Sequence, residues 1–195
     1  MSNSPMVMRD ITGYLEFEEA ERFVNSTKTL RNRIIIMLMW RCGLRVSEVI
    51  SIKKKHIYFG EKVLAVFGKG RKSRRIPIEY NLLEMLKEYT RDMKLDDKLF
   101  KISRFAVFKI VRELGKKVGI EMIGEKKIHP HHFRHSFAIF MVKNGMPLPK
   151  LQTILGHSSL TATFTGFVIL HFLASSFSFP FIRLGDMVEF GVVFN

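Results

Sequence analysis

The apolar stretch at residues 34–40, IIIMLMW, constrains the fold of this chain more than any other feature. A helix at the surface carries its apolar residues on one stripe, whereas this stretch is apolar nearly all round, so a helix that contains it must be buried on every side. We therefore expect a central helix over residues 30–41 with other elements packed around it. With 195 residues, the chain is long enough for one domain with a substantial core.

The rest of the pattern predicts further helices and a small sheet. Apolar residues recur every three or four positions over 15–27, 82–93, 104–118, 131–144 and 147–155, which is typical of helices with one buried face. Short strands are expected at 57–59, 63–67 and 75–78, with turns at Gly60 and at Gly68-Lys69-Gly70, and a further short strand at 99–100. The expected fold class is mainly α with a small antiparallel three-stranded β-sheet (α+β).

The charge of the chain favours a polyanionic partner. It has 32 Lys and Arg against 18 Asp and Glu, for a net charge of +14 and a pI near 10.1. On charge alone, nucleic acid and an anionic membrane both fit. The densest cluster is the turn GKGRKSRR at 68–75, which holds five basic residues. A charged hairpin tip is often only solvated, but at this density contact with phosphates is at least as well supported.

The segment from His129 to His157 places polar groups at helical spacing. His131 and Arg134 are one helical turn apart, so an imidazole and a guanidinium project from one face toward an anion. A second arginine, Arg45, follows the glycine that ends the central helix. Each signal is weak alone, because histidine patches are commonly solvated or bind adventitious metal, and Arg45 can form a purely structural ion pair with Glu48.

Cysteine content and hydropathy bear on the cellular location. The single cysteine, Cys42, cannot form an internal disulfide, which indicates a reducing compartment. The first ten residues contain no apolar stretch long enough for a signal peptide, so we expect a cytoplasmic protein. Residues 158–182 lack Asp, Glu, Lys and Arg, but Ser, Thr, Gly, His and Pro interrupt this run too often for a membrane span.

Four segments in a fixed order carry a family resemblance: GLRVSE (43–48), FGKGRKSRRIPI (67–78), HHFRHSFA (131–138) and LGHSSLTAT (155–163). Together they resemble the tyrosine site-specific recombinases of the phage-integrase and Xer type. The resemblance implies a domain that breaks and rejoins double-stranded DNA through a 3'-phosphotyrosine, with no metal, cofactor or small-molecule substrate. It also implies assembly on DNA as a homo-oligomer or with a full-length recombinase. The resulting division is an N-terminal arm (1–14), a catalytic domain (15–165) and a hydrophobic tail outside the family pattern (166–195).

The resemblance also assigns roles to individual residues. Arg45 and Arg134 would bind the non-bridging oxygens of the DNA phosphate, for which guanidinium groups are suited because they donate in pairs. Lys69 would be the general acid, His131 would assist proton transfer, and His157 would contact the phosphate or position the nucleophile. The remaining basic residues of the turn would contact the DNA backbone: Arg71, Lys72, Arg74 and Arg75.

Two features depart from the family pattern. The nucleophilic tyrosine is expected about nine residues after the LGH histidine, because a phenol is both nucleophile and leaving group, but residue 166 is glycine. The four tyrosines, at 14, 58, 80 and 89, all lie upstream. The 14 residues before Leu15 are also too few for the helical N-terminal domain of most members. Three hypotheses stay open: a truncated or rearranged catalytic domain, a non-enzymatic DNA-binding regulator, or a decayed integrase remnant.

Overall fold

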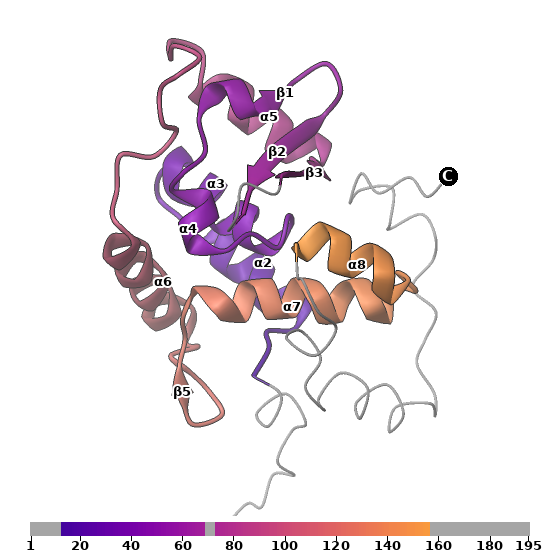
Figure 1. Cartoon of the computed structure of the whole chain (residues 1–195). Coiled ribbons are helices and arrows are strands. Elements are labelled where there is room, and N and C mark those ends of the chain that lie inside the picture. Colours follow the sequence, from indigo (N-terminus) through magenta and orange to yellow (C-terminus); the bar gives the residue numbers. More distant parts are fainter. Residues whose placement is uncertain (1–12, 69–72, 157–195) are drawn as a thin grey trace, which may run out of the picture.

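The computed structural model describes residues 13–68 and 73–156, which form helices around one hydrophobic core (Figure 1). The central element is α3 (Leu30–Trp40), whose residues Ile34 to Trp40 are all buried. Thr29 caps its N-terminus, where the Thr29 side chain accepts a hydrogen bond from the Asn32 N–H at 3.3 Å. The prediction of a buried central helix is therefore confirmed.

Helices surround α3 on several sides. It packs against α2 (Phe17–Asn25), α5 (Tyr80–Tyr89), α6 (Arg104–Val118) and α7 (Pro130–Lys143). The short elements α4 (Val46–Val49) and η1 (Lys54–His56) follow α3, and α8 (Leu148–Leu155) follows α7. Figure 1 shows α8 lying along α7, and α8 also contacts the sheet through β3. This arrangement brings the ends of α3, α7 and α8 to one region beside the sheet.

The sheet is antiparallel with the order β1 (Ile57–Tyr58), β2 (Val63–Phe67) and β3 (Ser73–Pro77). Leu64 pairs with Ile57 on one side and Ile76 on the other, and all three side chains are buried. Alternate residues face outward, among them Tyr58 and Phe67, which are exposed. The small β4 (Met122–Ile123) and β5 (Lys126–Lys127) form a separate antiparallel pair.

The structure confirms the fold class and corrects details. Residues 99–100 are buried but form no strand; the Leu99 N–H donates to the Ile52 carbonyl at 2.9 Å next to a single bridge between Lys53 and Lys98. The third strand begins two residues earlier than predicted. The β4–β5 pair escaped prediction because strands of two residues show no period. The proposed tail at 166–195 lies outside the described residues, as do residues 1–12 of the arm.

None of the helices in the described residues is long and apolar enough to span a membrane.

Candidate functional site

Three arginine side chains from separate segments converge on the buried carboxylate of Glu48. Arg74 donates from Nη1 to Oε1 at 2.8 Å and from Nη2 to Oε2 at 3.0 Å. Nη1 of Arg45 lies 3.3 Å from Oε1, and Nη1 of Arg134 lies 3.7 Å from Oε2. The side chains of Glu48, Arg74 and Arg134 are 5%, 8% and 8% exposed, while that of Arg45 is 34% exposed. The cluster is therefore buried at its base and opens to the surface at Arg45.

The turn after α3 sets the position of Arg45. Gly43 adopts a positive φ of 62° and the Leu44 N–H donates back to the Leu38 carbonyl at 3.2 Å, which ends the helix. Arg45 then caps α4, and its N–H donates to Oε2 of Glu48 at 2.8 Å. The ion pair between Arg45 and Glu48 that the sequence left open is present. Glu48 thus fixes both the backbone and the guanidinium of Arg45.

Helix α7 places Arg134 and His131 on one side of this cluster. Pro130 occupies the first helical position, where the missing N–H of proline has no partner to lose. The guanidinium of Arg134 donates from Nη1 to the Gly43 carbonyl and from Nη2 to the Leu155 carbonyl at 2.7 Å. His131 lies one turn earlier on the helix and is exposed. Backbone carbonyls therefore hold the buried guanidinium of Arg134 in place, while His131, one turn earlier, is exposed to solvent.

The C-terminal end of α8 supplies the acceptors that gather the guanidiniums. The Leu155 carbonyl accepts from Arg134 and also from Nη1 of Arg45 at 3.5 Å, and the Ile154 carbonyl accepts from Nε of Arg74 at 2.5 Å. Gly156 ends the helix with a positive φ of 65°. Carbonyls at a helix C-terminus have no partner within the helix and carry partial negative charge, so this end attracts cations.

The cluster has an excess of positive charge. Burial alone would raise the pKa of Glu48, but hydrogen bonds from Arg74 and Arg45 and the charges of Arg74 and Arg134 outweigh it and hold that pKa below its usual range. Burial, and then the charge of Arg45, lowers the pKa of Arg134 to about 9. Arg134 therefore stays charged at neutral pH, and three guanidiniums face one carboxylate. Such a site is chemically suited to bind an anion at its open side.

The pKa of His131 is lowered as well. Partial desolvation is the largest cause, followed by the charges of Arg134, Arg45 and Arg104. A histidine with a lowered pKa is neutral at pH 7 and can accept a proton or donate its ring N–H. The geometry thus provides an anion site with a group suited to proton transfer at its edge.

Two further histidines build the start of α7. The ring of His132 accepts the His129 N–H at Nδ1 (3.1 Å), and the ring of His129 accepts the His131 N–H at Nδ1 (3.3 Å). The two rings stack with centroids 3.9 Å apart. Both Nδ1 atoms must be unprotonated to accept, and burial, with the neighbouring His129 next, lowers the pKa of His132 to about 3. The helix start that presents His131 and Arg134 therefore depends on neutral histidines.

Acidification is expected to destabilise the fold through His132. The pKa of His132 is near 6.5 when unfolded and about 3 when folded, so the unfolded chain binds the proton first and stability falls as pH drops below 6.5. Between pH 7.5 and pH 5 the free energy of unfolding should decrease by about 2 kcal/mol from this residue. Urea unfolding across this range checks the value. His132→Gln, which can still accept the His129 N–H but does not titrate, should show a shallower pH dependence; equal slopes would contradict this assignment.

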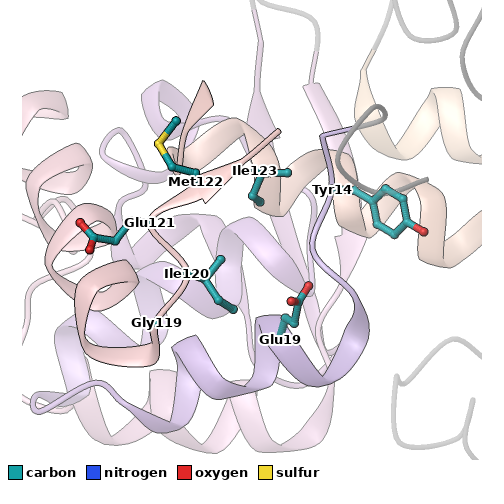
Figure 2. Close-up of a pocket in the computed structure, with 7 residues that line it drawn as sticks. All are labelled: Tyr14, Glu19, Gly119, Ile120, Glu121, Met122 and Ile123. Carbon is teal, nitrogen blue, oxygen red and sulfur yellow. The ribbon is translucent and has the colours of Figure 1, made fainter. Parts of the chain in front are cut away.

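A pocket of about 350 Å³ lies elsewhere on the molecule (Figure 2). Its lining is Tyr14, Glu19 and residues 119–123, from the segment before α2, from α2 itself and from the β4 region. No residue that the sequence singled out for chemistry contributes to it. In the part of the chain that the structure describes, no group of His, Cys, Asp and Glu side chains is arranged to hold a metal ion.

Comparison with known proteins agrees with the geometry. The model of the phage integrase family matches residues 13–166. The chain belongs to this family, the tyrosine recombinases. The recombinase XerA of Pyrococcus furiosus is 34% identical over 174 residues, covering 82% of this chain and 58% of the relative. XerD of Chlorobaculum tepidum is 31% identical over 182 residues, covering 83% and 59%. The chain thus spans under three fifths of the length of these curated relatives.

Solved structures of tyrosine recombinases have the same fold. The crystal structure of XerA superposes with a TM-score of 0.70 at 27% identity, over 86% of this chain and 66% of that one. XerH bound to its difH substrate before cleavage gives a TM-score of 0.68 at 26% identity, over 85% and 53%. The fold predicted from the resemblance is therefore the fold of this recombinase family.

The structure brings together only some of the residues singled out in this family member. Arg45 and Arg134 meet at Glu48 and at the end of α8, and His131 lies one turn before Arg134, near enough for the charges of both arginines to lower its pKa. Arg75 lies outward on β3, beside Glu61 and with its guanidinium carbon 5.2 Å from the centroid of the Tyr58 ring. Four others lie outside the described residues: Lys69, Arg71, Lys72 and His157.

Arg74 differs from its neighbour Arg75. The resemblance grouped both as DNA contacts, which stays a prediction, but the side chain of Arg74 is buried against Glu48. The reason is the alternation of β3: Arg74 and Ile76 face the interior, and Arg75 faces solvent. The sequence did indicate that Arg74 is buried. Ile76 and Ile78 mark the inward face of the strand, and Arg74 lies two and four residues before them, on the same face. Glu48 was likewise considered only as a partner of Arg45, not as the centre of three guanidiniums.

Proposed function

We propose that this chain is the DNA-binding catalytic domain of a tyrosine recombinase or integrase, and that its arginine cluster binds one phosphodiester of double-stranded DNA. The observation that carries the proposal is the shared carbonyl of Leu155. This acceptor is 110 residues from Arg45 and 21 residues from Arg134 in the sequence, yet it accepts from both side chains. Two guanidiniums that meet in this way can bind two oxygens of one phosphate.

Each role follows from the position of the group. Arg45 and Arg134 would stabilise the charge that develops on the phosphate oxygens, and His131, exposed beside them, would assist proton transfer. By resemblance, Lys69 would protonate the leaving oxygen and His157 would contact the phosphate. Arg75, Arg71 and Lys72 would contact the DNA backbone next to the site. The chemistry needs no metal or cofactor, since transesterification conserves the energy of the bond.

Double-stranded DNA as the partner has support from the relatives as well as from charge. XerH was solved with its difH substrate, and the Tn1549 transposon integrase was solved with circular intermediate DNA. The net charge of +14 favours the same class of partner. We propose assembly on DNA with further copies of the chain or with a full-length recombinase, in the cytoplasm, where the single cysteine stays reduced.

The nucleophile sets the limit of the proposed activity. Gly166 stands at the position expected for the tyrosine. The Tyr14 hydroxyl bonds to Glu16 and to Lys143 near the end of α7, and the Tyr89 hydroxyl donates to the Leu99 carbonyl. Tyr58 and Tyr80 are exposed. A DNA-binding regulator without its own strand cleavage is therefore the second candidate function, and Gly166 is the observation that favours it.

We predict DNA binding without covalent attachment. Duplexes selected from a random 40-base-pair pool by binding to the chain should be rebuilt with a nick as suicide substrates and run on a denaturing gel. The expected result is a salt-sensitive complex and no protein–DNA adduct, because residue 166 lacks a phenol.

Replacing Arg75 should weaken the salt dependence of DNA binding. In Arg75→Gln, the magnitude of the slope of log K against log salt concentration should decrease by about 1 if this arginine contacts a phosphate.

The two parts of this proposal fail separately. A stable adduct would show that the chain does contain a nucleophile. No binding at low salt, with the fold intact by circular dichroism, would overturn the proposed DNA-binding function.

A further inference from the structure

We propose that Arg74 is a positioning residue: it occupies both oxygens of the Glu48 carboxylate, so that this carboxylate does not draw Arg45 and Arg134 into closer pairs and their guanidiniums can bind a phosphate. The inference rests on the proposed function, because it concerns how the same anion site is kept positive. It differs from the expectation for the hairpin, in which Arg74 would itself contact DNA.

The contacts of Arg74 leave it unsuited to bind DNA directly. Its two Nη atoms donate in parallel to the two oxygens of Glu48, and its Nε donates to the Ile154 carbonyl. The side chain is 8% exposed. All three nitrogens of this guanidinium are thus engaged with the protein in a buried position. A bidentate pair of this kind has the strongest and most directional geometry available to arginine and a carboxylate.

Arg45 has the opposite properties. Its side chain is 34% exposed, and its Nη1 donates at 3.3 Å to Glu48 and at 3.5 Å to the Leu155 carbonyl. Within the described residues, its Nε and Nη2 donate to no protein group. Of the arginines around Glu48, Arg45 therefore keeps two guanidinium nitrogens that no protein group in the described residues occupies, on a side chain that solvent reaches.

Removal of Arg74 would change the partner of Glu48. A buried carboxylate that loses its bidentate partner recruits the nearest cations, and these are Nη1 of Arg45 at 3.3 Å and Nη1 of Arg134 at 3.7 Å. A small rotation of either side chain would form a closer pair. Each such pair would direct a guanidinium at Glu48 and cancel its charge toward an incoming anion. Arg74 therefore protects the phosphate site by satisfying the competing carboxylate.

Arg74 also joins three elements around the site. It lies on β3, pairs with Glu48 on α4 and binds the carbonyl of Ile154 on α8. Gly156 packs directly on it, since a Cβ at that position would lie 2.9 Å from Nη1 of Arg74. The same arginine thus fixes the end of α8, whose Leu155 carbonyl gathers Arg45 and Arg134.

Phosphate titrations of the whole chain test this inference. Inorganic phosphate is the probe, and the readout is the 15N-detected Nε–Hε signals of Arg45 and Arg134, assigned by substitution of each arginine. In wild type these signals should shift saturably. Arg74→Gln should weaken phosphate binding by about tenfold or more, because Glu48 then competes for both side chains. Arg22→Gln, on α2 with its side chain 55% exposed, is the charge control and should match wild type.

The double variant separates positioning from a merely structural role. Glu48→Gln combined with Arg74→Gln removes the competing carboxylate together with its partner, so phosphate affinity should return to within about threefold of wild type. If the double variant binds as weakly as Arg74→Gln, Arg74 acts only through the fold. If Arg74→Gln binds like wild type, the inference fails and the proposed function stands.

A second substitution covers the case in which Arg74→Gln does not fold. Arg74→Lys keeps a positive charge beside Glu48 but cannot hold both oxygens at once. Its phosphate affinity should fall below that of wild type, and Glu48→Gln in the same background should restore it. Equal affinity of wild type and Arg74→Lys, with no gain from Glu48→Gln, would overturn the inference. Absence of any phosphate effect on Arg45 and Arg134 in wild type would instead overturn the proposed function.

Discussion

Replacing Glu48 by alanine is expected to lower the free energy of unfolding by about 3–5 kcal/mol, because it leaves buried guanidiniums without their counter-charge. Glu48 is the carboxylate toward which Arg45, Arg74 and Arg134 converge, and it also accepts the Arg45 N–H that caps α4. The melting temperature should fall by roughly 6–20 °C for a chain of this size. Thermal and urea unfolding at pH 7 measure the change.

A surface pair provides the matched control. Glu84→Ala removes an equally short ion pair, 2.7 Å from Lys87, but both side chains are more than 40% exposed. Its cost should be at most about 1 kcal/mol. Added phosphate should also raise the melting temperature of Glu48→Ala more than that of wild type, since an anion can replace the missing carboxylate. If Glu48→Ala is no less stable than Glu84→Ala, the carboxylate does not hold the cluster together.

The core could be predicted because its signal is local. The run IIIMLMW is apolar on every side, and the structure buries it on every side in α3. Residues 99–100 show where that reasoning stops. Their side chains are as buried as those of a strand, but the Leu99 N–H donates to the Ile52 carbonyl and the Leu99 carbonyl accepts from the Tyr89 hydroxyl, so no strand ladder forms there. Burial is recorded in the sequence, whereas the partner of each backbone group depends on tertiary contacts.

The candidate site was only partly predictable for a similar reason. The family resemblance pointed to Arg45, His131 and Arg134. The structure brings Arg45 and Arg134 together, with His131 one helical turn before Arg134; their chemical roles remain predictions. The resemblance did not indicate that Glu48 lies between three arginines. Arg74 and Arg75 are adjacent and alike in sequence, yet one is buried and the other exposed, because a strand alternates at every residue. A list of basic residues cannot make that distinction without the register of β3.

The site therefore depends on how its charges are divided as much as on which residues are present. One carboxylate and the carbonyls at the end of α8 hold three guanidiniums close together, which their mutual repulsion opposes. The excess positive charge that results is what an incoming phosphate would neutralise. Because the guanidiniums repel one another, small displacements of the backbone carbonyls that hold them should disturb the cluster, most of all at the turn between α3 and α4.

Gly43→Ala is expected to lower the free energy of unfolding by about 2–4 kcal/mol. Two effects contribute to this loss: the backbone strain of a positive φ and a steric clash of the new Cβ. Gly43 has a φ of 62°, and a Cβ there would lie 2.5 Å from Cδ1 of Phe137 and 3.1 Å from Cδ2 of Leu155. Phe137 and Leu155 are both buried and have little room to move. Thermal unfolding of the variant measures the loss.

Gly119→Ala isolates the backbone contribution. Gly119 has a φ of 72°, but a Cβ there would meet no atom within 4 Å, so only the strain of about 1 kcal/mol should remain. The difference between the two variants reports the clash with α7 and α8. Because the Gly43 carbonyl accepts from Arg134, and the Leu155 carbonyl accepts from both Arg45 and Arg134, the same clash should displace the guanidiniums. Gly43→Ala should therefore weaken phosphate and DNA binding, while Gly119→Ala should not; equal effects on both measurements would show that close packing at Gly43 does not position the cluster.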